Sequence, residues 1–227
     1  IAGALGAEVL GVDLGARLDD ATVAALRRAF LDHLVLFFRD QKLDAAGLVA
    51  FGRRFGRPVP YPFVRGLPDL PEVIEVVKLP HERVNFGGIW HSDTVYQPEP
   101  PMGSMLLAQE LPPVGGDTLF ANMYLAYETL SAGMRRMLDG LRAVHNSRKG
   151  TATRTREDGA PGASFEAEHP VVRTHPETGR KALYVNPAFT MKFEGWSTRD
   201  SKPLLDHLFQ VSRSEAFTCR FRWAPGS

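Results

Sequence analysis

The sequence has 227 residues, enough for one domain with a sizeable core, and its 44% apolar and 23% charged residues are typical of a globular protein. The 27 basic and 26 acidic residues give a net charge of +1, so charge gives no reason to expect nucleic acid or an anionic membrane as a partner. No apolar run approaches the roughly 20 residues that cross a bilayer, and the single cysteine excludes an internal disulfide and fits a cytoplasmic location.

The first part of the chain alternates short apolar segments with helical patterns. Residues 7–14 predict a strand, and an aspartate at position 19 or 20 predicts the cap of a helix with one apolar face. The apolar segment 34–38 predicts a strand buried on both faces. A second helix is predicted after Asp44, and Gly56 is expected to end it.

The middle of the chain is predicted to form loops and short strands. Residues 57–71 carry several prolines and indicate a loop. Residues 72–77, 89–96 and 104–108 are rich in β-branched, aromatic and other apolar side chains, so each predicts a strand. Residues 118–120 are expected to be extended after a Gly-Gly turn.

The later part combines a capped helix, a polar segment and a hairpin. Ser131 predicts the start of a helix. Residues 147–167 hold many Gly, Thr, Arg and Glu residues and few large apolar ones, which predicts a mobile segment or lid. The segments 171–174 and 182–185 are strand patterns separated by turn-forming residues, which is typical of a hairpin.

The chain is predicted to close with a helix and a strand. The helix is expected to start late, near Ser201, because Pro203 lacks the N–H that a helix interior needs. Residues 217–223 alternate apolar and polar side chains, as a half-buried strand does. Short strands broken by proline and glycine, with helices among them, predict a mainly β fold with inserted helices, either a β sandwich or a jelly roll. The sequence contains neither a glycine-rich phosphate loop nor a Gly-x-Ser-x-Gly elbow.

His91 and Asp93 are the candidate metal ligands. In the strand predicted at 89–96, residues i and i+2 point to the same face, about 6–7 Å apart. One ring nitrogen and one carboxylate oxygen can then reach a single cation. Imidazole and carboxylate are the ligands of mononuclear non-haem iron, where two histidines and one acid leave three positions open. The alternative is an ordinary hydrogen-bonded pair at the surface, since such tripeptides also occur by chance.

Several short motifs occur in one order along nearly the whole chain. They are 11–14 (Gly-Val-Asp-Leu), 90–93 (Trp-His-Ser-Asp), 112–118 (Pro-Pro-Val-Gly-Gly-Asp-Thr), 169–176 (His-Pro-Val-Val-Arg-Thr-His-Pro), 184–186 (Tyr-Val-Asn) and 221–223 (Phe-Arg-Trp). As a set they resemble the taurine dioxygenase family of Fe(II)- and 2-oxoglutarate-dependent dioxygenases, which includes aryloxyalkanoate dioxygenases.

The resemblance implies a fold, an activity and roles for individual residues. It implies a double-stranded β-helix, a jelly roll, that hydroxylates a small organic acid and releases succinate and carbon dioxide. His91 and Asp93 would be two of the three Fe(II) ligands, and Thr118 would bind the distal carboxylate of the co-substrate 2-oxoglutarate. We expect residues 1–227 to be one dioxygenase domain without its closing strands, so that the second histidine ligand and the arginine that grips 2-oxoglutarate follow Ser227.

The resemblance is compatible with either a sulfonate or a carboxylate as the substrate. Tyr61, Val64 and Gly87 stand where taurine dioxygenase has its taurine-binding residues, and none matches, which argues against taurine itself. Tyr61 and Phe189 are the candidate residues of the substrate pocket, although a core position is an equal alternative for Phe189. Family members are often dimers or tetramers, so a homo-oligomer is expected.

Two other functions are compatible with the same residues. The chain could be a jelly-roll binding protein that has lost the complete iron site, which the absence of an assigned third ligand favours. A zinc hydrolase could use the same His-Asp pair, because zinc accepts these ligands. The lack of a nucleophile motif or a third ligand cluster makes the hydrolase the weakest of the three.

Overall fold

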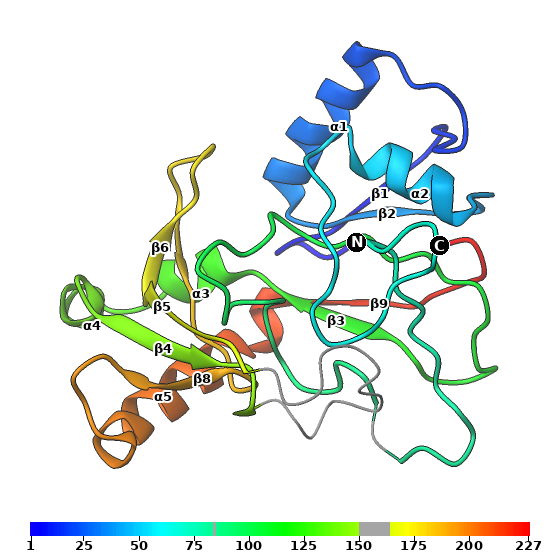
Figure 1. Cartoon of the computed structure of the whole chain (residues 1–227). Helices are drawn as coiled ribbons and strands as arrows, with labels where there is room; N and C mark the ends of the chain where they lie inside the picture. The colour runs from blue at the N-terminus through cyan, green and yellow to red at the C-terminus, as the bar shows by residue number, and fades with distance from the viewer. Residues whose placement is uncertain (84, 150–163) are drawn as a thin grey trace. The chain divides into compact units, whose positions relative to one another are not determined.

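The computed structural model describes residues 1–83, 85–149 and 164–227 (Figure 1). The chain divides into two compact units. Unit 1 consists of residues 1–58, 104–122 and 213–227, and unit 2 consists of residues 59–103 and 123–212. Within the described ranges, none of the helices combines the length and the apolar character that a bilayer crossing requires.

Unit 1 is built from two helices packed against paired strands. Its elements are β1 (Ala7–Val9), α1 (Asp20–His33), β2 (Leu36–Phe38), α2 (Ala45–Gly52), β3 (Thr118–Ala121), a short 3-10 helix (Glu215–Phe217) and β9 (Thr218–Phe221). β1 pairs in parallel with β2, and β3 pairs antiparallel with β9. In Figure 1, α1 and α2 lie together on one side of the β1–β2 pair.

The two helices of unit 1 start where the sequence predicts. The side chains of Asp19 and Asp44 each accept a backbone N–H bond of 2.7 Å from the first turn, as N-caps do. The end of α2 was predicted wrongly, because the helix stops at Gly52 and Gly56 lies beyond it. After Gly52 the backbone tightens into bonds to the third residue back, such as Phe55 N–H to Gly52 O at 3.0 Å, and this ends the α-helix.

The core of unit 1 is aromatic. Phe37 of β2 stacks on Phe221 of β9 with ring centroids 3.9 Å apart, and Leu5 and Cys219 complete the buried cluster. The predicted alternation of β9 is confirmed, since Cys219 and Phe221 are buried and Arg220 is exposed. β1 and β2 are shorter than predicted, and within β2 only Phe37 is buried.

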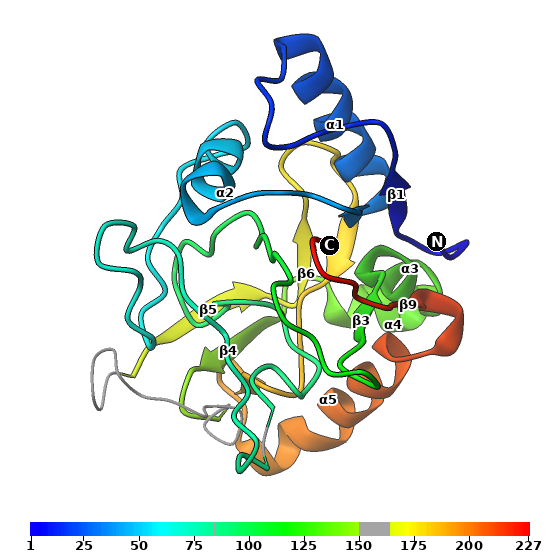
Figure 2. The same cartoon turned by 90° about the vertical axis from the view of Figure 1, so that its right-hand side faces the viewer.

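Unit 2 holds a three-stranded antiparallel sheet, a hairpin and a long helix. Its elements are α3 (Met123–Glu128), α4 (Ala132–Leu138), β4 (Arg142–Asn146), β5 (Glu166–Pro170), β6 (Val172–Thr174), β7 (Lys181–Leu183), β8 (Thr190–Phe193) and α5 (Thr198–Ser212). The sheet order is β5–β4–β8, and β6 and β7 form the predicted hairpin. α5 packs on β8, and Figure 2 shows β4 and β5 running side by side.

Three predicted strands are absent. Residues 72–77, 89–96 and 104–108 form neither strands nor ladder pairs in the described part of the chain. Val76 and Leu106 keep 52% and 59% of their surface exposed. An apolar, β-branched segment becomes a strand only when another strand supplies hydrogen-bond partners, and none of the strands within the described ranges pairs with these segments.

Two predictions in the later part of the chain have different outcomes. α5 starts at Thr198, not near Ser201, because Ser197 caps it by accepting the backbone N–H of Asp200 at 3.1 Å, and Pro203 lies inside the helix. The expected lid at 147–167 falls mostly on residues 150–163, which lie outside the described residues. Its last two positions belong to β5.

Unit 2 also buries two histidines side by side. His145 of β4 is fully buried and His169 of β5 is 5% exposed, with ring centroids 5.6 Å apart. Nδ1 of His145 lies 3.2 Å from the hydroxyl of Thr190, and its Nε2 has no hydrogen-bond partner in the described structure. Burial lowers the pKa of His145 to about 3, so the core holds this histidine in its neutral form.

We expect His145 to make the protein less stable in acid. The unfolded chain binds a proton at this histidine near its ordinary pKa of 6.5, whereas the folded chain binds it only near 3. The free energy of unfolding should therefore fall as the pH drops from about 6.5 towards 3, with a slope of at most about 1.4 kcal/mol per pH unit from this residue. Urea unfolding of the wild type and of His145→Asn over this range measures the difference in slope. Parallel curves would contradict the assignment.

Candidate functional site

His91 and Asp93 lie at the edge of a buried turn and not on the predicted strand. Residues 93–96 form the turn, in which Thr94 has a left-handed φ of +50° and accepts the N–H of Gln97 at 2.9 Å. Val95 and Tyr96 are 0% and 1% exposed, so they anchor the turn in the core of unit 2. The side chains of His91 and Asp93 remain 31% and 56% exposed.

The two candidate ligands face each other. Nε2 of His91 lies 3.2 Å from Oδ1 of Asp93. Nδ1 of His91 lies 2.6 Å from the carbonyl oxygen of Ile89, and donation to this carbonyl fixes the ring and leaves Nε2 directed at the carboxylate. The hydrogen bond to Asp93 raises the pKa of His91, against the opposing effect of burial.

This geometry fits two ligands of one metal ion. Nitrogen and oxygen ligands stand about 2.1 Å from a first-row metal, so two of them at right angles are about 3 Å apart. The observed 3.2 Å between the two atoms meets that requirement without movement of the backbone. No cluster of three or more His, Cys, Asp or Glu side chains suited to a metal occurs among the residues that the structure describes. The pair is therefore a candidate for two ligands of one metal ion.

An aromatic cluster borders His91 within unit 2. The ring of Phe189 stands at 88° to the His91 ring with centroids 6.3 Å apart, and it packs on Tyr96 at 5.0 Å. Tyr96 contacts Phe63 at 5.6 Å, and Phe63 contacts Tyr61 at 5.7 Å. We call this set the aromatic cluster: Tyr61, Phe63, Phe86, Tyr96, Phe165 and Phe189. It extends from His91 to Tyr61, so both predicted pocket residues belong to it.

Thr118 opens β3 in unit 1, and its hydroxyl is held by a tryptophan. Nε1 of Trp223 donates to Oγ1 of Thr118 at 2.9 Å. Because this bond uses the oxygen as acceptor, the hydroxyl hydrogen remains available for donation to a ligand. The neighbouring Asp117 pairs with Arg220 at 3.4 Å across the β3–β9 ladder. The first residue of β3 thus presents a fixed hydroxyl donor.

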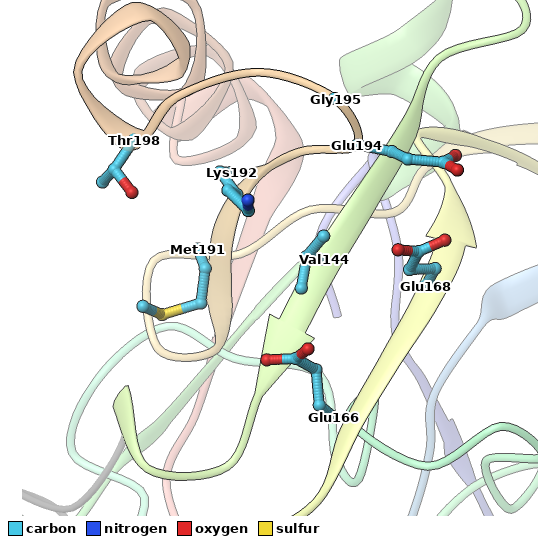
Figure 3. Close-up of a pocket in the computed structure, with 8 residues that line it drawn as sticks. All are labelled: Val144, Glu166, Glu168, Met191, Lys192, Glu194, Gly195 and Thr198. Atoms are coloured by element: carbon cyan, nitrogen blue, oxygen red, sulfur yellow. The ribbon is translucent and has the colours of Figure 1, made fainter.

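A separate depression of about 360 Å³ lies on the β5–β4–β8 sheet of unit 2 (Figure 3). It is lined by Val144, Glu166, Glu168, Met191, Lys192, Glu194, Gly195 and Thr198, and so by none of the predicted site residues. Arg142 lies 3.9 Å from Glu168 and 3.5 Å from Glu194, which partly neutralises the acidic groups. The depression is therefore a weaker candidate than the His91–Asp93 pair.

Sequence reasoning missed two supports of the site. The carbonyl of Ile89 fixes the His91 ring, and Trp223 fixes the Thr118 hydroxyl. The first is a local contact that the two-residue spacing could have suggested. The second joins positions 105 residues apart, and only the pairing of β3 with β9 brings them together.

The whole sequence matches one protein family. The sequence model described as "Taurine catabolism dioxygenase TauD, TfdA family" matches residues 1–227. An alpha-ketoglutarate-dependent sulfate ester dioxygenase of Pseudomonas putida is 34% identical over 242 residues, which cover 100% of this chain and 77% of that protein. An (S)-phenoxypropionate/alpha-ketoglutarate-dioxygenase of Sphingobium herbicidovorans is 31% identical, with 97% and 80% covered.

The fold is similar to that of solved dioxygenases. A taurine dioxygenase from Burkholderia xenovorans matches with a TM-score of 0.82 and 38% identity, over 99% of this chain and 75% of that one. The chain therefore has the fold of the taurine dioxygenase-like structures.

We predict that the His91–Asp93 pair determines metal affinity. Replacing either residue by alanine removes a donor atom, and the dissociation constant for Mn(II) should rise about tenfold or more. Electron paramagnetic resonance of free Mn(II) during titration measures this constant. His81→Ala is the control, since His81 is an exposed histidine of the same unit and its loss should leave the affinity unchanged. Equal affinities in all variants would contradict the prediction.

Proposed function

The chain belongs to the taurine catabolism dioxygenase TauD, TfdA family, and we propose that it hydroxylates a small organic acid at a ferrous ion held in part by His91 and Asp93. It is an Fe(II)- and 2-oxoglutarate-dependent dioxygenase, whose reactants are dioxygen and a small molecule. The observation that supports the residue assignment is the 3.2 Å separation of His91 Nε2 and Asp93 Oδ1.

The two proposed ligands contribute different properties to metal binding. The Asp93 carboxylate supplies negative charge, and His91 supplies a neutral nitrogen whose orientation the Ile89 carbonyl fixes. When bound, Fe(II) and 2-oxoglutarate supply the oxidation, in which 2-oxoglutarate loses carbon dioxide to become succinate and one oxygen atom of dioxygen enters a substrate C–H bond. The protein orients these groups and keeps water from the reacting carbon.

Thr118 is the proposed contact for the co-substrate. Its hydroxyl hydrogen donates to the distal carboxylate of 2-oxoglutarate, while Trp223 holds the oxygen from the other side. A hydroxyl with one fixed partner has fewer orientations to lose when it binds an anion. A hydrogen bond to a charged group contributes about 1.5–3 kcal/mol, which suits a co-substrate that must be held during turnover.

The substrate is proposed to carry an apolar group beside its acid group. The aromatic cluster, which contains Tyr61 and Phe189, offers aromatic surface next to His91. The relatives named above act on a sulfate ester and on phenoxypropionate, both of which combine an anionic and an apolar part. Taurine carries an ammonium group in place of an apolar one, and Tyr61, Val64 and Gly87 differ from the residues that bind it in taurine dioxygenase.

We further propose the fold, the domain organisation, the oligomeric state and the cellular location of the enzyme. The similarity to solved taurine dioxygenases supports a double-stranded β-helix, and the match over residues 1–227 supports one catalytic domain that includes both units. We also propose a homo-oligomer, as members of the family often are. The net charge of +1 gives no reason to expect nucleic acid or an anionic membrane as a partner, and the single cysteine fits the cytoplasm.

Turnover is the direct test of the proposed function. With Fe(II), 2-oxoglutarate and dioxygen, the full-length protein should form succinate faster with hexyl sulfate, hexanesulfonate or phenoxypropionate than with taurine. Asp93→Ala should reduce substrate-dependent succinate at least about 100-fold, because it removes a metal ligand, whereas Asp69→Ala, an exposed acid elsewhere in unit 2, should not. If no iron-dependent succinate appeared with any of the acids, the proposed function would be wrong.

Thr118 gives a separate prediction for the co-substrate. Thr118→Val keeps the shape of the side chain but loses the hydroxyl, so the KM for 2-oxoglutarate should rise about tenfold. Thr118→Ser keeps the hydroxyl and should stay within about twofold of the wild type. Succinate formation at varied 2-oxoglutarate measures both constants, and an unchanged KM in the valine variant would exclude the proposed contact.

A further inference from the structure

Phe189, the residue of the aromatic cluster that contacts His91, has its backbone fixed on both sides. Its N–H donates to Oδ1 of Asn186 at 2.9 Å, and its carbonyl accepts the backbone N–H of Asn146 at 2.9 Å. Residues 187–189 form a turn before β8, where a backbone is usually free to vary. Here both polar groups of the peptide backbone have fixed partners.

The buried hydroxyl of Thr190 stabilises this turn. Oγ1 of Thr190 accepts the N–H of Asn186 at 2.8 Å, and the N–H of Thr190 donates to the carbonyl of Asn186 at 3.1 Å. The same Oγ1 lies 3.2 Å from Nδ1 of His145, so its hydrogen can be donated to that nitrogen. Thr190 and His145 are fully buried, and Asn186 is 5% exposed.

Burial makes these bonds decisive for the shape of the turn. Apolar packing is non-directional and tolerates small rotations of a ring, whereas a hydrogen bond fixes distance and angle. A buried donor that loses its acceptor is strongly disfavoured, so the observed arrangement of the turn, which satisfies Asn186, Thr190 and His145 together, is favoured. That arrangement places the Phe189 ring against His91.

We propose that Asn186 and Thr190 are positioning residues, which fix Phe189 against His91 and thereby set how closely the apolar part of the substrate is held beside the reacting carbon. The contact between Phe189 and His91 is a property of the folded protein, while the effect on substrate rests on the function proposed above. Asn186 accepts the N–H of Phe189 and Thr190 accepts the N–H of Asn186, so both act on His91 through Phe189.

A matched pair of variants at position 190 tests the proposal. Thr190→Val has nearly the same volume as threonine but loses the hydroxyl, and Thr190→Ser keeps the hydroxyl. The first readout is the Cε1–H resonance of His91 in the metal-free protein, assigned by its loss in His91→Gln. The ring current of Phe189 changes the chemical shift of this resonance. The Phe189→Leu variant, which lacks the aromatic ring, gives the chemical shift without that effect. The second readout is the KM of the best acid in the panel, compared with the KM for 2-oxoglutarate.

The expected result is a change in Thr190→Val that Thr190→Ser does not show. In the valine variant the His91 resonance should move towards its position in Phe189→Leu, and the KM for the organic acid should rise about tenfold while that for 2-oxoglutarate stays within about twofold. If Thr190→Val does not fold, Asn186→Ala is measured instead, with the same expectation, because it removes the acceptor for the Phe189 N–H.

In an active enzyme, wild-type behaviour of the variant in either readout would overturn the proposal. If the wild type forms no succinate with any acid, the proposed function fails, and the resonance of His91 alone then decides whether Thr190 positions Phe189. The two failures are therefore distinguishable.

Discussion

The burial of Val95 and Tyr96 is the constraint on which the candidate site depends. Both side chains are almost completely inaccessible, and burying side chains of this size is worth about 1.5–3 kcal/mol each. They hold a turn in which Thr94 adopts a left-handed backbone that is unfavourable for a β-branched residue. The core therefore stabilises a local conformation that the sequence alone disfavours, and this conformation leaves His91 and Asp93 partly exposed and in contact with each other.

The side chains of the proposed site are each fixed on one side and open on the other. His91 is held at Nδ1 by a carbonyl and directs Nε2 to Asp93, while Thr118 is held at its oxygen by Trp223 and keeps its hydrogen for a ligand. Phe189 follows the same rule, with a fixed backbone and a ring that packs on His91. Groups that are oriented before ligands arrive lose less entropy on binding, which favours both metal affinity and catalysis.

The sequence predicted well those features that depend on neighbours within a few residues. The N-caps at Asp19 and Asp44, the 172–183 hairpin and the alternation of β9 all rest on such local patterns, and all are confirmed. The strands predicted at 72–77, 89–96 and 104–108 are wrong because strand propensity requires a pairing partner that cannot be read from the segment itself.

For the site, the sequence by itself determined the chemistry: an imidazole and a carboxylate two residues apart, a threonine after a Gly-Gly turn, and the order of motifs that places the chain in its family. Tertiary structure decided how these groups are presented. It replaced the expected strand by a turn, set Phe189 beside His91 and joined Trp223 to Thr118. The reason is physical: the type and spacing of donor atoms are covalent properties of the chain, whereas their orientation depends on packing between segments that lie far apart in sequence.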